Sequence, residues 1–390
     1  MSQIKKIVMH KNNIFLSICI PTYNRVEKLK AQLERIDRNV SNLDICKNIE
    51  ILVSDNNSSD STIELCKQYA QMDLPYKFKY RTNEKNIGPS ANFMEALLGA
   101  TGEYVWMMSD DDIIHEGGIE YLYKKIVENT EAGYIFINYF LGKNKKFGAG
   151  IPPQTKDHMA YSFDQFLNET LLFYSLVSAS CFRRSLLSRE KLENRIRRGN
   201  YSAKDDDKIV NFSTGNFYPQ LYWVSDIVTS HPSLIIGKPL FTMHHPGVER
   251  TRTLPYPLTG IREPFDPYLM AHLDAIEFHS HMMNYELTLN TKIKVFRFLA
   301  NENLNQIIFH KTTVQKYDVK AIRTAIPVMI RKFYLNPFLW VLHLPVLILP
   351  SIVAKKIEPL RWKYLIIRAK FGALIKKCIG SLKRITQKTR

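Results

Sequence analysis

The sequence is poor in cysteine, and none of its five cysteines forms a Cys-x-x-Cys pair. This scatter excludes a disulfide framework and a zinc site built on paired thiolates, and it indicates a reducing, cytoplasmic environment. The N-terminus also lacks an apolar run before Ile14, so we expect no signal peptide. A glycine-rich phosphate loop is missing there too, and its place is taken by Pro-Thr-Tyr-Asn, which argues against a nucleotidyltransferase.

Acidic residues are scarce relative to basic ones, with 37 Asp and Glu against 54 Lys and Arg and a formal charge of +17. The excess is concentrated in residues 355–390, which hold twelve basic residues against the single acid Glu358. A concentrated positive charge indicates an anionic partner. Because apolar residues are interleaved with these charges, we expect an anionic membrane surface and no nucleic acid. A basic, solvated helix packed on the protein is the alternative.

Long runs without charge are rare, and the one at residues 336–354 has nineteen residues. This length could just span a bilayer, but Pro337, Pro345 and Pro350 would each break helical hydrogen bonds. We therefore favour a kinked or re-entrant segment within one leaflet over a span, with a buried core helix as a third option. With the basic residues that follow, the segment predicts a membrane-associating tail over residues 335–390.

The first 140 residues alternate strand-like and helix-like patterns, which is typical of a parallel α/β sheet with crossover helices. We expect strands at residues 15–20, 49–53, 76–80 and 103–108. Polar residues follow the first, second and fourth of these strands. Because ligands of open α/β sheets bind beyond the carboxyl ends of the strands, the three polar segments are expected to meet at one site.

Three consecutive aspartates, Asp110, Asp111 and Asp112, follow the fourth expected strand. Neighbouring carboxylates resist ionising together unless a cation joins them. Mn²⁺ or Mg²⁺ would resolve this repulsion, since these ions prefer oxygen ligands and take one or two carboxylates plus phosphate oxygens of a substrate. The alternative is an N-cap and exposed first turn for the helix expected near Gly117.

Other polar residues after the strands suit a nucleotide. Asp55 could accept a hydrogen bond from a nucleobase, and Tyr23 beside Pro21 could stack on it. Asn86, Gly88 and Asn92 lie in a loop that enters a helix, where amide groups can hold phosphate or ribose oxygens. Each has an ordinary structural interpretation as well, as a cap, a rim residue or a helix start.

Four motifs together resemble the family 2 glycosyltransferases of GT-A fold, in both order and spacing. They are Pro21-Thr22-Tyr23-Asn24-Arg25, Val53-Ser54-Asp55-Asn56-Asn57-Ser58-Ser59-Asp60, Asn86-Ile87-Gly88 with Asn92, and Gly102-Glu103-Tyr104 leading to Ser109-Asp110-Asp111-Asp112. The resemblance is strong over residues 14–140, and the Ser-Asp-Asp form of the last motif is similar to the abequosyltransferase-like branch that builds bacterial surface polysaccharides.

The resemblance implies a Rossmann-like, mostly parallel central sheet flanked by helices, with a helical membrane-associating extension. We expect a catalytic domain over residues 1–250, a helical acceptor-side region over 251–334 and the tail over 335–390. The activity implied is transfer of a sugar from a nucleoside diphosphate donor to a lipid-linked saccharide, at the cytoplasmic face of the plasma membrane and with inversion.

The resemblance also assigns roles to individual residues. Asp111 would ligate the metal, while Asp110 and Asp112 would support the donor sugar or the metal. His245 would complete the metal or diphosphate site, although a loop histidine with neither role is an alternative. The donor nucleotide would be held by residues of the first three motifs: Pro21, Thr22, Tyr23, Asn24 and Asp55 at the base, and Asn86, Gly88 and Asn92 near the ribose and diphosphate.

Two features depart from the family pattern. Ser109 replaces the first aspartate of the usual Asp-x-Asp-Asp motif, and no Glu-Asp pair stands about a hundred residues later, where the catalytic base is expected. Asp205-Asp206-Asp207 lies in that interval, but we interpret it as a run of solvated charges. Asp226 follows an aromatic segment, where partial burial is expected. A non-catalytic protein that binds membrane or nucleic acid would explain the basic tail but not the aspartate motifs.

Overall fold

The computed structural model describes residues 13–41, 43–142, 150–194, 199–201, 209–212, 219–243, 278, 282, 285–296, 298 and 330. Nearly all of them fall in one compact unit, which comprises Met1–Glu263 and Asp274–Phe298. Most of the region expected over 251–334 and all of the tail expected over 335–390 lie outside the described residues, so both boundaries stay predictions. Among the helices that are described, none has the length and apolar character needed to cross a bilayer.

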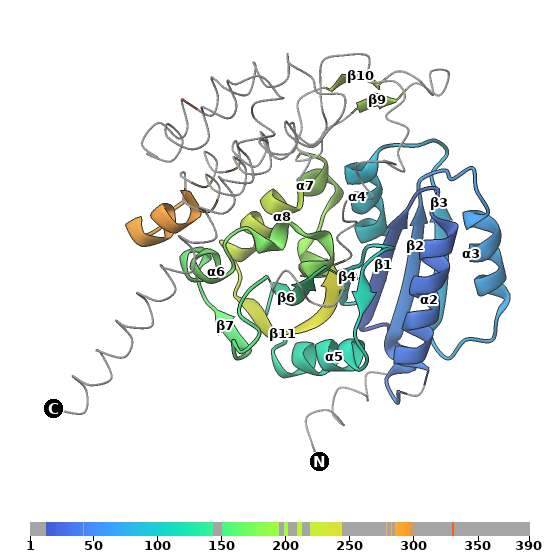
Figure 1. Ribbon diagram of the computed structural model, residues 1–390, viewed down its shortest axis with the longest axis horizontal. Coiled ribbons are helices and arrows are strands. Elements are labelled where there is room, and N and C mark those ends of the chain that lie inside the picture. Colours follow the sequence, from blue (N-terminus) through green and yellow to red (C-terminus); the bar gives the residue numbers. More distant parts are fainter. Residues whose placement is uncertain are drawn as a thin grey trace, which may run out of the picture. The chain divides into compact units, whose positions relative to one another are not determined.

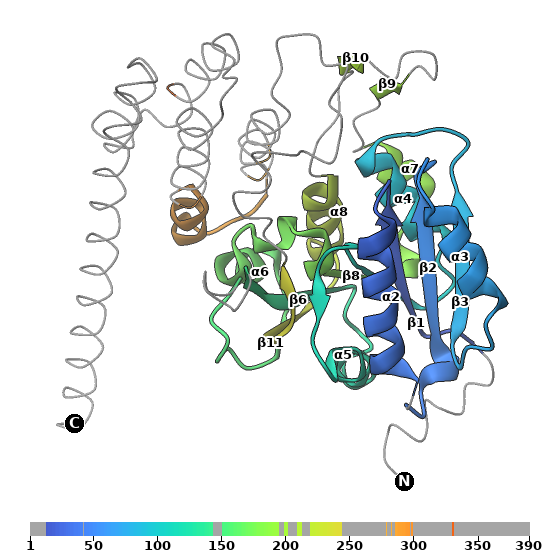
Figure 2. The ribbon, with the colours of Figure 1, turned by 45° about the vertical axis from the view of Figure 1, so that its right-hand side comes forward.

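A nine-stranded mixed sheet, ordered β3-β2-β1-β4-β8-β6-β11-β5 with β7 on β11, forms the centre of the unit (Figures 1 and 2). Its strands are β1 (Leu16–Thr22), β2 (Ile49–Asp55), β3 (Lys77–Thr82), β4 (Tyr104–Met107), β5 (Ile113–Ile114), β6 (Tyr134–Leu141), β7 (His158–Ala160), β8 (Ser180–Arg183) and β11 (Ser233–Met243). A separate antiparallel pair joins β9 (Gly199–Tyr201) to β10 (Ile209–Phe212).

Helices flank the sheet, four short 3₁₀ turns accompany them, and residues 289–296 are also helical. The helices are α2 (Val26–Val40), α3 (Thr62–Gln71), α4 (Pro89–Gly99), α5 (Gly118–Glu128), α6 (Phe163–Thr170), α7 (Arg189–Glu193) and α8 (Pro219–Val228). The 3₁₀ turns are Cys46–Asn48, Phe173–Ser175, Val177–Ala179 and Arg184–Leu186. The expected Rossmann-like architecture is confirmed.

The half of the sheet that the sequence predicted is fully parallel. Strands β3, β2, β1 and β4 run side by side in one direction. Every residue of β1 and β2 is buried, because helices cover both faces, and this explains why both strands are mostly apolar. Antiparallel β8 then separates β4 from β6, so the whole sheet is mixed and less parallel than expected.

The strand register brings the motif residues to one edge. Thr22 at the end of β1 pairs with Asp55 at the end of β2, and Asp55 pairs with Thr82 at the end of β3. The helices that follow these strands begin beyond that edge (Figure 2). The loops that follow β1, β2 and β3 therefore begin next to one another at this edge of the sheet.

The opposite edge of the sheet contains a buried carboxylate. Glu50 on β2 is fully buried and accepts hydrogen bonds from Ser17 Oγ at 2.9 Å, Thr101 N at 2.8 Å and Thr101 Oγ1 at 2.6 Å. Lys77 and Lys79 on β3 approach it at 3.4 and 3.2 Å. Burial alone would raise the pKa of Glu50, but these hydrogen bonds and Lys79 outweigh it and hold the pKa below its ordinary value.

Glu50→Gln is expected to destabilise the protein by about 2 kcal/mol at pH 7, because the buried hydrogen bonds lose their charged acceptor. The depressed pKa means that the ionised form stabilises the fold above the unfolded pKa of about 4.3 and that this contribution is lost as the pH falls further. Urea denaturation between pH 7 and pH 3 should therefore show the wild type losing its advantage at the acid end. A constant difference across this range would contradict the assignment.

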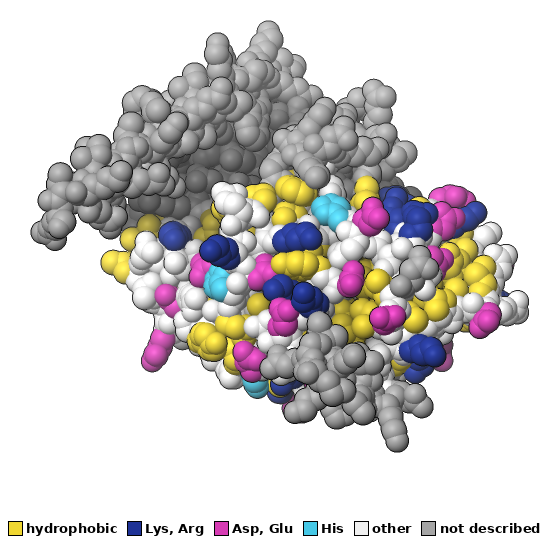
Figure 3. All heavy atoms as spheres, turned by 90° about the horizontal axis from the view of Figure 1, so that it is seen from below, with side chains coloured by type: hydrophobic (Ala, Val, Ile, Leu, Met, Phe, Trp, Pro, Cys, Tyr) yellow, Lys and Arg dark blue, Asp and Glu magenta, His cyan; other side chains and the backbone are white. Residues whose placement is uncertain are grey.

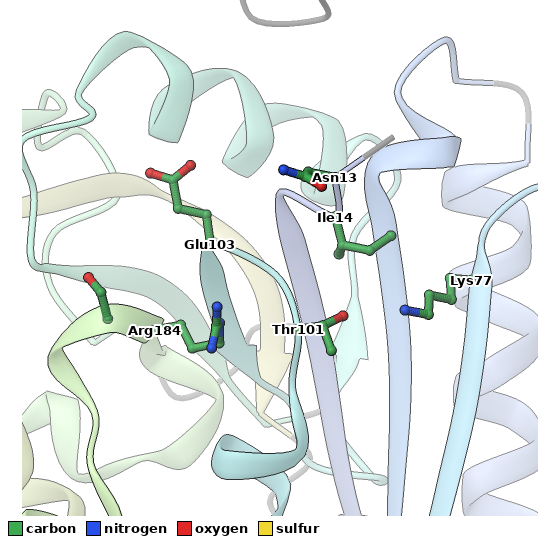
Figure 4. Close-up of a pocket in the computed structure, with 7 residues that line it drawn as sticks. Asn13, Ile14, Lys77, Thr101, Glu103 and Arg184 are labelled. Carbon is green, nitrogen blue, oxygen red and sulfur yellow. The ribbon is translucent and has the colours of Figure 1, made fainter. Parts of the chain in front are cut away.

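A polar hollow of about 430 Å³ lies near the same edge, and Figure 4 shows the side chains around it, which come from β3, from the segments before β1 and β4 and from the turn after β8. It is lined by Asn13, Ile14, Lys77, Thr101, Glu103, Arg184 and Ser185.

Charges of both signs alternate over the described surface in Figure 3. On that face the positive excess of the chain forms no single patch.

Candidate active site

Backbone hydrogen bonds hold together the loops that follow β1, β2, β3 and β4. Asn56 N donates to Thr22 O at 3.0 Å, and Asn83 N donates to Asp55 O at 3.0 Å. Met108 N donates to Cys19 O at 2.8 Å, which extends the pairing of β1 and β4 towards the aspartate motif. The three motif segments expected to meet do lie at one edge.

Asp110 is a buried link between the first and the fourth loop, with only 2% of its surface exposed. Its Oδ2 accepts from Thr22 Oγ1 at 2.8 Å, and its Oδ1 accepts from Arg25 Nη1 at 2.7 Å. Burial, together with the charge of Asp111, raises the pKa of Asp110 although Arg25 acts in the opposite direction. Both carboxylate oxygens bond residues at the end of β1 or just after it, and the support of the donor sugar or metal expected of Asp110 stays a prediction.

Asp111 is surrounded by cations and is more exposed than its neighbours, at 9% of its side chain. Ser109 Oγ donates to its Oδ1 at 2.6 Å, while Arg25 and Lys28 lie 3.4 and 3.3 Å from its Oδ2. Burial alone would raise the pKa of Asp111, but the Ser109 hydrogen bond and the two cations lower it below the ordinary value. Asp111 is therefore ionised at neutral pH, as a metal ligand must be.

Asp112 is held by a residue that no sequence motif marked. Ser178, in the 3₁₀ turn Val177–Ala179, donates from Oγ to Asp112 Oδ2 at 2.6 Å. The same Oγ accepts from Ser109 N at 2.9 Å. Ser178 lies in a region whose sequence is irregular, and one serine carries no signal that could have identified it.

Asp55 is the last residue of β2, where the second loop begins, and it is fully buried. It accepts hydrogen bonds from both the backbone N and the Oγ of Ser58, and Ser58 Oγ in turn accepts from Asn24 N at 2.8 Å. Burial raises the pKa of Asp55 even though Ser58 lowers it. Asn24 adopts φ = 51°, a conformation that asparagine tolerates better than most residues, and its hydrogen bond to Ser58 joins the first loop to the second.

Asn86 and Asn92 belong to a network of side-chain amides behind the site. Asn92 is 3% exposed, accepts from Ser54 Oγ at 2.8 Å and donates to Ser54 O at 2.9 Å. Asn86 Oδ1 accepts from Asn56 Nδ2 at 2.7 Å and from Gly88 N at 2.9 Å. Gly88 has φ = 82°, which only glycine adopts freely, and it is the N-cap residue of α4. These hydrogen bonds give Asn92 a structural role, and its contact with a nucleotide-sugar donor stays a prediction.

The other predicted site residues are placed only by their element and their burial. Pro21 is buried in β1, and Tyr23 is partly exposed at the edge, as a stacking side chain would need to be. Asp226 on α8 is exposed, so its expected partial burial is wrong. His245 and residues 205–207 lie outside the described residues.

The donor groups of the aspartate motif fit a particular kind of metal site. Within the described part of the chain, no three or more His, Cys, Asp or Glu side chains converge on one point. Mg²⁺ and Mn²⁺ commonly take only one or two carboxylates and complete their shell with water and substrate phosphate. Ionised Asp111, with Asp112 beside it in sequence, fits that arrangement.

The family model for glycosyl transferase family 2 matches residues 17–193, which contain every loop described above. The chain carries a family 2 glycosyltransferase domain. The resemblance read from the four motifs is thus confirmed, and the structure places those motifs at one edge of the domain's sheet.

Curated relatives support the same family. The chain is 36% identical over 110 residues to abequosyltransferase RfbV of Salmonella typhimurium, over 28% of this chain and 32% of the relative. It is 34% identical over 128 residues to a GalNAc(5)-diNAcBac-PP-undecaprenol beta-1,3-glucosyltransferase of Campylobacter jejuni, over 33% of this chain and 39% of the relative. The matched segments span only about a third of each relative.

A solved structure supports the fold over a longer part of the chain. TarS 1–349 of S. aureus, in complex with UDP-GlcNAc, gives a TM-score of 0.54 at 16% identity and covers 82% of this chain and 81% of its own. The family 2 glycosyltransferase domain therefore shares its overall architecture with TarS.

Proposed function

We propose that the protein transfers a sugar from a nucleoside diphosphate donor to a lipid-linked saccharide during synthesis of a bacterial surface polysaccharide. One observation carries the proposal: ionised Asp111, with Asp110 and Asp112 beside it in the chain, lies at the carboxyl edge of a family 2 sheet whose second strand ends in Asp55. This is the edge where open α/β sheets bind nucleotides.

The proposed donor site divides the residues by chemistry. Tyr23 and Asp55, with Pro21, Thr22 and Asn24 beside them, would hold the base, and the loop containing Asn86 would lie nearer the ribose and diphosphate. Asp111, supported by Asp112, would hold Mn²⁺ or Mg²⁺. When bound, the ion neutralises negative charge on the diphosphate leaving group. Ser109, Arg25 and Lys28 keep Asp111 ionised and oriented for this role.

The acceptor and the location belong to the same proposal. One relative is named for an undecaprenol-linked substrate, and the basic tail over 335–390 would hold the protein at an anionic membrane surface. The reaction would take place at the cytoplasmic face with inversion at the anomeric carbon. His245 would complete the metal or diphosphate site.

The test is slow donor hydrolysis and donor binding by the full chain, measured with UDP-, GDP-, CDP- and dTDP-sugars, each with and without Mn²⁺. We expect one nucleotide to be preferred and hydrolysis to depend on the ion. Transfer to a polyprenyl diphosphate saccharide should exceed that hydrolysis. Binding of no nucleotide sugar in the panel would refute the proposal and leave a non-catalytic membrane-binding protein as the better explanation.

A further inference from the structure

Ser178 makes two hydrogen bonds to the aspartate motif from a distant part of the chain. Its hydroxyl donates to Asp112 Oδ2 at 2.6 Å and accepts from Ser109 N at 2.9 Å, so one oxygen bridges both ends of the turn from Ser109 to Asp112. Ser178 is fully buried and Asp112 is 2% exposed. Buried hydrogen bonds to a carboxylate are strong and hold geometry well.

The backbone of Ser178 is itself fixed. Its carbonyl oxygen accepts from the indole Nε1 of Trp106 at 2.8 Å, and Trp106 is fully buried in β4. The aspartate motif begins two residues after the end of β4. The strand that carries the motif therefore also positions the serine that bridges it.

Contacts from other elements hold the rest of the segment from Leu171 to Ser178. Tyr139 of β6 donates from its hydroxyl to Phe173 O at 3.1 Å, and Gln220 of α8 donates to Ser175 O. Leu171 adopts φ = 50°, a conformation that non-glycine residues rarely take and that persists only where surrounding structure imposes it. The segment is held firmly enough to fix a side chain at its end.

A common pattern places Ser178 among the residues of the site. Each of the four carboxylates accepts a hydrogen bond from one hydroxyl group: Asp55 from Ser58, Asp110 from Thr22, Asp111 from Ser109 and Asp112 from Ser178. Three of these hydroxyls come from the motif loops themselves. Ser178 comes from the part of the domain beyond α6, and it ties that part to the aspartate motif.

We propose that Ser178 is a positioning residue that fixes the orientation of Asp112 towards the donor and its divalent ion. The inference rests on the proposed function, because it assumes that Asp112 supports the metal or the donor sugar. Ser178 would act through Asp112 and the backbone of Ser109, without touching the donor.

The test compares Ser178→Ala with Ser178→Thr, which keeps the hydroxyl, and with Ser225→Ala as a matched control. Ser225 is also fully buried, and its hydroxyl donates to Leu221 O at 2.7 Å within α8, so its loss removes a buried hydrogen bond outside the site. Binding of Mn²⁺ in the presence of UDP is measured from the electron paramagnetic resonance signal of the free ion. Donor hydrolysis and thermal unfolding are recorded for the same full-length proteins.

We expect Ser178→Ala to weaken Mn²⁺ binding about tenfold and to lower kcat for hydrolysis more than it raises KM. Ser178→Thr should recover most of both, and Ser225→Ala should bind and turn over like the wild type. Normal Mn²⁺ binding and kcat in Ser178→Ala, with only a lower melting temperature, would overturn the inference. A wild type without turnover on any nucleotide sugar would refute the proposed function instead, so the two failures are distinguishable.

Discussion

Replacing Asp111 with alanine is expected to lower kcat/KM for sugar transfer roughly a thousandfold, equivalent to about 4 kcal/mol of transition-state stabilisation. The carboxylate is held ionised by Ser109, Arg25 and Lys28, and it is the most exposed of the three consecutive aspartates. Without it, the divalent ion would lose its main protein ligand. The measurement is initial-rate kinetics with the preferred donor over a range of Mn²⁺ concentrations.

The same substitution should change the free energy of unfolding by no more than about 1 kcal/mol, because removal of Asp111 also relieves its repulsion with buried Asp110. Glu34→Ala is a suitable control, since Glu34 is an exposed carboxylate on α2. It should leave both kinetics and stability unchanged. Full activity of Asp111→Ala at saturating donor would show that another group binds the metal.

Asp110→Ala should instead act mainly on stability, and we expect a loss of about 3 kcal/mol. The substitution removes a buried carboxylate that bonds Thr22 and pairs with Arg25 at 2.7 Å, where Arg25 is only 14% exposed. Removing one partner of a largely buried ion pair is strongly destabilising because the other charge stays desolvated. Urea denaturation and a drop in melting temperature of roughly 6–12 °C would report the effect.

A double-mutant cycle tests whether the pair itself is responsible. Arg25→Met combined with Asp110→Ala should cost less than the sum of the single substitutions, by about 1–2 kcal/mol. The comparison is Glu128→Ala, which removes the exposed Lys125–Glu128 pair and should cost no more than about 0.5 kcal/mol. Strict additivity of the two buried substitutions would mean that Arg25 and Asp110 contribute independently.

The parallel half of the fold was predictable because local patterns encode it. The buried runs of β1 and β2 and the apolar face of α2 have the periodicities that strands and helices require. The order of these elements, with polar residues after each strand, also predicted where Asp55 and the aspartate motif would meet. The structure confirms that placement, because Thr22 pairs with Asp55 in the strand register and its hydroxyl donates to Asp110.

The other half was not predictable from the same patterns. Strand β8 has only four residues and lies antiparallel between β4 and β6, while β11 adds to β6 from about a hundred residues later in the chain. Such pairings depend on which edges are left open after the first strands have formed. Short strands carry too little periodicity to identify them beforehand.

The sequence by itself therefore determined the fold class, the family and the positions of the aspartates, because these depend on residue type and on order along the chain. The tertiary structure decided what each carboxylate contacts. Asp110 accepts hydrogen bonds from Thr22 and Arg25, and Asp111 lies beside Lys28 at the more exposed side. Ser178 donates to Asp112, although the two residues are 66 positions apart in the chain. Hydrogen bonds act over about 3 Å in space, and separation along the chain does not reveal which groups folding brings within that distance.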